Sequence, residues 1–175
     1  MVKRDPIPSL NLRQPAGALH RAVGDARIAA FATDGKTETP MPKQIITSST
    51  APTTGFTDQS TPSPLAQAIR FGAMLFVSGQ GPLDPETREV VSDDIRAQTR
   101  QTLTNLVGVL DAAGATLANV VNMRVCLRDT KDFPAFNETF REFMQGEKVT
   151  RTCIGGTPHR AGVNVEIDCV AMFDE

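Results

Sequence analysis

The chain has 175 residues, enough for one domain with a substantial core but short for two. Its net charge of −2 argues against a dedicated nucleic-acid binder, and no apolar run approaches the ~20 residues of a membrane span. Three cysteines and two histidines argue against a disulfide framework and a Cys/His zinc site, and the odd number of thiols favours a reducing, cytoplasmic setting.

Residues 1–40 differ in charge from the rest of the chain. They hold six basic and four acidic side chains, a net charge of +2, and Leu19 and Val23 could share one face of a short helix. We expect a flexible or partly helical extension, followed by one domain at residues 41–175. An organelle transit segment and a natural start at Met41 stay open as alternatives.

The first part of the domain predicts strands. Residues 43–47 favour a short strand, and residues 48–64 are rich in Ser, Thr and Pro, which predicts a loop. Residues 65–70 and 74–78 read as two strands of a hairpin around Phe71, Gly72 and Ala73.

A long amphipathic helix follows the hairpin. It is predicted to begin near Asp93 or Asp94, whose carboxylates suit a helix N-terminus, and to end with Gly114 as its C′ residue. Its buried stripe consists of Leu103, Leu106, Val107 and Leu110.

The second half predicts strand, helix, strand, strand. Residues 120–128 alternate, and a second helix follows Asp132 with Pro134 in its first turn. Residues 150–154 and 163–173 predict the last two strands. The second helix carries an apolar stripe for core packing, formed by Phe133, Phe136, Phe140, Phe143 and Met144.

This order of elements predicts an α+β or α/β layer, in which one mixed sheet has two helices on one face. The other face would stay partly uncovered, and oligomerisation is the natural way to bury it.

Motifs for phosphate binding and for hydrolytic triads or zinc catalysis are absent from the sequence. Arg151 and Cys153 should share one face of a strand, where an arginine could grip a carboxylate with two hydrogen bonds. Glu166 lies among apolar neighbours and could act as a general acid or base, and Gly79 would let a ligand approach the backbone. An exposed arginine, a solvated glutamate and an ordinary strand end are the plainer readings. We interpret His159 as a solvated loop histidine.

The chain resembles the Rid family (YjgF-like, also called L-PSP), the reactive intermediate enamine/imine deaminases. The resemblance spans about residues 41–173 and rests on collinear segments. They include MPKQIIT at 41–47, LFVSGQ at 75–80, DIRAQTR at 94–100, LRDTKDF at 127–133, RTC at 151–153 and VEI at 165–167.

The resemblance implies a chorismate-mutase-like α+β fold and a homotrimer with sites between subunits. It implies hydrolysis of short-lived enamines and imines, such as 2-aminoacrylate, to 2-oxo acids and ammonia. It implies no metal and no cofactor, and a small carboxylate substrate. The charge and the lack of a long apolar run, as noted above, predict neither nucleic acid nor membrane as a partner.

The same resemblance assigns roles to particular residues. The carboxylate-binding arginine falls on Arg151 and the acidic residue on Glu166, which, or else a backbone carbonyl, would orient the attacking water. The remaining substrate-binding positions fall on Gly79, Asn137 and Cys153, and Cys153 is interpreted as a small packed residue rather than a nucleophile.

Departures from the family pattern surround the expected pocket. Leu65 takes the place of a family tyrosine, no tyrosine occurs in the chain, Val149 replaces a proline, and Gly155 and Gly156 replace a larger pair. A wider or more apolar mouth would suit a larger substrate, such as 2-aminomuconate. A non-catalytic ligand-binding or chaperone-like trimer is the alternative, and the acidic charge balance argues against a ribonuclease.

Overall fold

The computed structural model describes residues 42–52 and 64–174. The chain divides into two units, Met1–Thr39 and Pro40–Glu175, and all described residues belong to the second. The expectations for the N-terminal extension and for most of the loop at 48–64 lie outside the described residues. Within the described part, no helix is both long and apolar enough to span a membrane.

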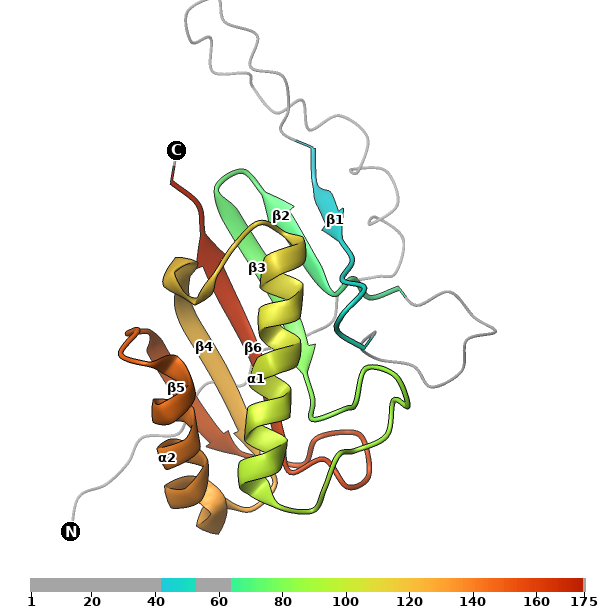
Figure 1. The fold of residues 1–175 in the computed structure, drawn as a ribbon. Helices are drawn as coiled ribbons and strands as arrows, with labels where there is room; N and C mark the ends of the chain where they lie inside the picture. The colour runs from blue at the N-terminus through green and yellow to red at the C-terminus, as the bar shows by residue number, and fades with distance from the viewer. Residues whose placement is uncertain (1–41, 53–63, 175) are drawn as a thin grey trace, which may run out of the picture. The chain divides into compact units, whose positions relative to one another are not determined.

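The elements follow the predicted order (Figure 1). The strands and helices are β1 (Gln44–Ile46), β2 (Ala68–Phe71), β3 (Met74–Gln80), α1 (Ile95–Ala112), β4 (Val120–Leu127), α2 (Phe133–Met144), β5 (Thr150–Gly155) and β6 (Val165–Met172). Two single 3-10 turns, Leu117–Asn119 and Thr130–Asp132, lead into β4 and α2.

The strands form one mixed sheet in the order β1-β2-β3-β6-β4-β5. Neighbouring strands are antiparallel except β4 and β5, which are parallel and leave β5 at one edge. Figure 1 shows α1 and α2 on the same face of this sheet. The mixed sheet with two helices on one face is therefore confirmed.

The core lies between the helices and the sheet. Met123, Val125 and Leu127 of β4 point into it, as their alternation predicts. The largest fully buried apolar side chains are Leu75, Leu103, Leu106, Leu110, Met123, Leu127, Phe136 and Ile167.

Two predicted strands begin later than expected because side chains occupy their first backbone groups. The hairpin strand starts at Ala68 rather than residue 65, since Ser78 Oγ donates a hydrogen bond to Ala66 O at 2.7 Å. The last strand starts at Val165, since Val163 O accepts a hydrogen bond from Arg128 Nε at 2.7 Å.

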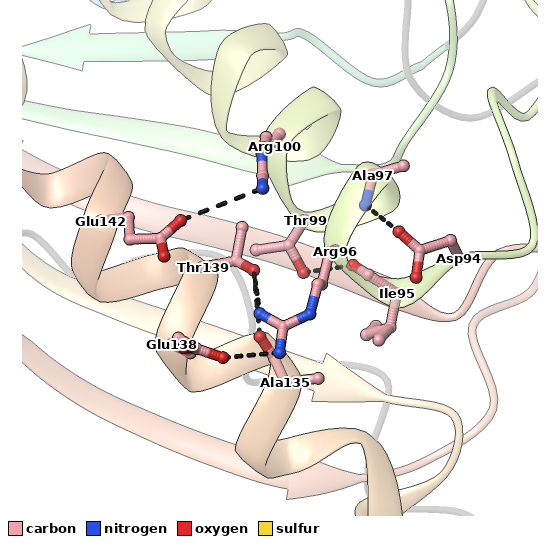
Figure 2. A network of polar contacts seen from close by, with 10 residues as sticks. All are labelled: Asp94, Ile95, Arg96, Ala97, Thr99, Arg100, Ala135, Glu138, Thr139 and Glu142. Atoms are coloured by element: carbon pink, nitrogen blue, oxygen red, sulfur yellow. Dashed lines mark hydrogen bonds and ion pairs between the residues drawn. The ribbon is translucent and has the colours of Figure 1, made fainter.

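The ends of α1 match the prediction. Asp94 is the N-cap, and its carboxylate accepts a hydrogen bond from Ala97 N at 2.9 Å (Figure 2). Gly114 follows the C-terminus with φ of 75°, a conformation that glycine adopts without steric cost. Figure 2 also shows Arg96 and Arg100 of α1 paired with Glu138 and Glu142 of α2, exposed contacts that contribute little stability.

Replacing Asp94 with alanine is expected to lower the free energy of unfolding by about 1 kcal/mol, because an N–H of the first turn of α1 loses its acceptor. Urea denaturation measures the difference. Asp93→Ala is the matched control, because the Asp94 carboxylate, not that of Asp93, accepts the capping hydrogen bond. Equal losses in the two variants would contradict this account of the cap.

The face of the sheet opposite the helices, called the open face below, carries exposed apolar side chains. Ile45 and Phe71 are 66% and 56% exposed, and Phe76 is 45% exposed. The ladder puts Met74 beside Met172 on the same face. Exposed apolar area of this kind usually marks a protein–protein contact.

Candidate functional site

Arg151 lies on the edge strand β5, on the side that faces α2. Its parallel ladder partner is Met123, whose side chain is fully buried under the helices. The Arg151 guanidinium carbon lies 4.5 Å from the ring centroid of Phe140 and 5.3 Å from that of Phe136. At these distances the aromatic faces attract the cation, so the apolar stripe of α2 also supports the arginine.

Asn137 fixes the orientation of this guanidinium. Its Oδ1 accepts a hydrogen bond from Arg151 Nη2 at 2.7 Å, across a separation of fourteen residues. Within the described residues this is the one hydrogen bond that the Arg151 guanidinium makes, and a guanidinium has five N–H groups. Arg151 is thus a half-buried, oriented cation with donors left for an anionic ligand.

Cys153 lies two residues further along β5, on the same side of the sheet as Arg151. It is half-buried and packs against the core. Burial raises the pKa of its thiol, while the neighbouring Arg151 acts in the opposite direction. A thiol with a raised pKa is protonated at neutral pH and is a poor nucleophile, which agrees with a packing role.

Glu166 lies on the open face instead. Its neighbours Val165 and Ile167 are buried toward the helices, so its own side chain points the other way. A Cβ atom added at Gly79 would lie 2.6 Å from Glu166 Oε1, so only glycine lets the carboxylate lie over the β3 backbone. Burial, and then the charge of Glu166, raise the pKa of the facing Cys126 thiol.

The five residues singled out in the sequence therefore form two groups in one chain. Arg151, Asn137 and Cys153 make a half that carries the guanidinium, on the helix side of β5. Gly79 and Glu166 make an acidic half on the open face, and β4 separates β6 from β5. The two strands lie about 10 Å apart and the two halves point to opposite faces, so one small substrate cannot contact both halves of a single chain.

The sequence does not predict that His159 lies beside the acidic half. His159 is exposed, as expected for a loop histidine, but its Nδ1 lies 3.8 Å from Glu166 Oε2. Nothing in the spacing of His159 and Glu166 signals this approach, because the loop between β5 and β6 determines it. The described residues contain no group of three or more His, Cys, Asp or Glu side chains placed to hold a metal.

Comparison with known proteins identifies relatives of this chain. The sequence model described as endoribonuclease L-PSP matches residues 58–173. A 2-iminobutanoate/2-iminopropanoate deaminase of Dermatophagoides farinae is 31% identical over 133 residues, 76% of this chain and 98% of the relative. A RutC family protein of Pyrococcus horikoshii is 40% identical over 108 residues, 62% of this chain and 86% of the relative.

A solved structure shares the fold. The crystal structure of E. coli TdcF with bound serine is 29% identical and superposes with a TM-score of 0.66, covering 75% of this chain and 99% of that one.

Proposed function

The chain belongs to the endoribonuclease L-PSP family, which includes proteins named as Rid proteins and imine deaminases, and from this membership we propose that it hydrolyses reactive enamines and imines. The products are a 2-oxo acid and ammonia. The reaction needs no metal and no cofactor, because an imine carbon is already electrophilic and positioning with a charged clamp accelerates the attack of water.

The observation that carries this proposal is the oriented guanidinium of Arg151. A 2-imino acid has a carboxylate next to its C=N bond, and an arginine binds such a group with two parallel hydrogen bonds. Asn137 and the aromatic rings hold the guanidinium in place before the substrate arrives. TdcF, a structural neighbour, binds serine, which also carries a carboxylate beside a nitrogen-bearing carbon.

The chemistry needs only water and a proton carrier. An enamine first tautomerises to the imine, and the water oxygen then bonds to the imine carbon while Glu166 accepts a proton from the water. As the C=N double bond opens, the nitrogen takes up the proton held by Glu166 and then the proton of the new hydroxyl. The C–N single bond breaks, ammonia leaves, and the hydroxyl oxygen becomes the carbonyl oxygen. Proton transfer by a positioned carboxylate typically contributes about 10²- to 10⁴-fold.

The division into two halves supports a site shared between protomers. In a ring of identical subunits each contact joins different surfaces of the two neighbours. Arg151 of one protomer can then face Glu166 of the partner subunit across the contact. We propose a homotrimer, in which the exposed apolar side chains of the open face become buried.

The substrate class is a small 2-imino or 2-enamino acid, such as 2-aminoacrylate or the larger 2-aminomuconate. Leu65, at the position of a family tyrosine, is 55% exposed, and it offers an apolar surface in place of a phenol. An apolar mouth of this kind favours a substrate with a longer carbon chain than that of 2-aminoacrylate.

The test uses 2-aminoacrylate generated in place by an amino-acid dehydratase, with ammonia release followed in the presence and absence of the protein. The proposal predicts release well above the uncatalysed rate, in metal-free buffer with a chelator. Binding of 2-oxo acids without turnover of 2-aminoacrylate or 2-aminomuconate would instead favour the non-catalytic trimer.

A further inference from the structure

His159 lies beside Glu166 on the open face. The proposed reaction uses the Glu166 carboxylate and gives His159 no role. His159 Nδ1 lies 3.8 Å from Glu166 Oε2, while Glu166 Oε1 is the oxygen that lies close over Gly79. The two oxygens of the carboxylate thus have different surroundings. Oε2 faces the His159 imidazole, and Oε1 lies over the backbone of Gly79 near the end of β3.

The loop that carries His159 is held in place on both sides of it, and before it Gly156 N donates to Leu127 O at 2.9 Å. The residue after His159, Arg160, donates from Nη2 to Arg88 O at 2.7 Å, and its own carbonyl accepts from Arg128 Nη2 at 3.0 Å. Arg128 also donates from Nε to Val163 O at 2.7 Å. Although the imidazole is exposed, the hydrogen-bonded backbone on either side of it keeps His159 within reach of Glu166.

The other ionisable groups beside Glu166 do not bind its carboxylate. Arg124 pairs with Asp168, two residues along β6 on the same face, with its Nε 3.0 Å from Oδ1. Cys126 faces Glu166 across the ladder, and its raised pKa keeps the thiol neutral. Among the described residues, His159 is therefore the one basic side chain within ion-pair distance of the Glu166 carboxylate.

We propose that His159 is a positioning residue, which holds Oε2 of Glu166 so that Oε1 is aimed at the attacking water. This inference rests on the proposed deaminase function. The distance of 3.8 Å is long for a hydrogen bond, and such contacts commonly tighten when substrate binds. His159 needs only an N–H group for this role, and the proton from water still goes to Glu166.

His159→Leu is expected to lower kcat for ammonia release about tenfold, the equivalent of one hydrogen bond at the reacting carboxylate, with KM within about twofold. His159→Gln keeps an amide N–H and is expected to recover at least about a third of the wild-type kcat. Thr157→Ala, an exposed change in the same loop, is the matched control and should leave both constants unchanged.

The outcomes separate the two levels of the proposal. Normal kcat in His159→Leu, or His159→Gln no better than His159→Leu, would overturn the role of His159. If the wild type shows no deaminase activity, both proposals fail. If the wild type is active and His159→Leu is equally active, the deaminase function stands and the positioning role of His159 does not. The thermal unfolding midpoint and the assembly size of each variant are measured as well, and values equal to those of the wild type show that each variant is folded.

Discussion

Arg151→Ala is expected to lower kcat/KM for 2-aminoacrylate hydrolysis by about 10²- to 10³-fold, because the substrate carboxylate loses a charged two-pronged partner. Most of the loss should appear in KM, since the guanidinium contacts a group that keeps its charge throughout the reaction. Arg151→Lys keeps the charge but not the fork of donors, so its activity should lie between those of alanine and wild type. Steady-state kinetics of ammonia release measure all three.

Arg96→Ala is the matched control for this substitution. Arg96 also contacts α2, through an exposed ion pair with Glu138 (Figure 2), whereas the α2 partner of Arg151 is Asn137. Its removal should leave kcat/KM unchanged. Activity of Arg151→Ala above about a third of wild type would mean that the arginine does not bind the substrate carboxylate.

Glu166→Gln is expected to lower kcat by about 10²-fold or more with little change in KM, because an amide fills the same space but cannot accept the proton of water. Asp168→Asn is the control, since Asp168 lies on the same face two residues along β6 and is already paired with Arg124. Rapid mixing with 2-aminoacrylate generated at saturating levels gives kcat directly. Equal kcat in the Gln variant and wild type would assign the water to a backbone carbonyl instead.

Much of the fold is readable from the sequence because each local signal has a local cause. The alternation in β4, the Asp94 cap and Gly114 after α1 all depend on residues close in the chain. The cap of α2 shows the limit. Asp132 occupies the N-cap but makes no side-chain hydrogen bond there, while the Asp129 carboxylate accepts from Lys131 N in the preceding 3-10 turn.

The candidate site depends on contacts between distant segments, and these were only partly predictable. The family resemblance indicates Arg151 and Asn137, but their spacing in the sequence does not show that α2 lies over β5. This packing puts Arg151 Nη2 2.7 Å from Asn137 Oδ1. The phenylalanine stripe of α2 was interpreted as core, and Phe136 is indeed fully buried, yet its ring also lies under the guanidinium. The approach of His159 to Glu166 depends on a loop conformation that no periodic pattern encodes.

In the proposed trimer, Arg151 of one protomer and Glu166 of the partner subunit act on the same substrate. This shared site is tested by co-expressing Arg151→Ala and Glu166→Gln chains with two different tags and isolating assemblies that carry both. Each parent lacks one half of every site, but a trimeric ring that holds both chains has both halves intact at one of its three contacts, about a third of them. We predict that the isolated mixed assemblies regain up to about a third of wild-type activity. Mixed assemblies no more active than either parent, beside an active wild type, would contradict the shared site.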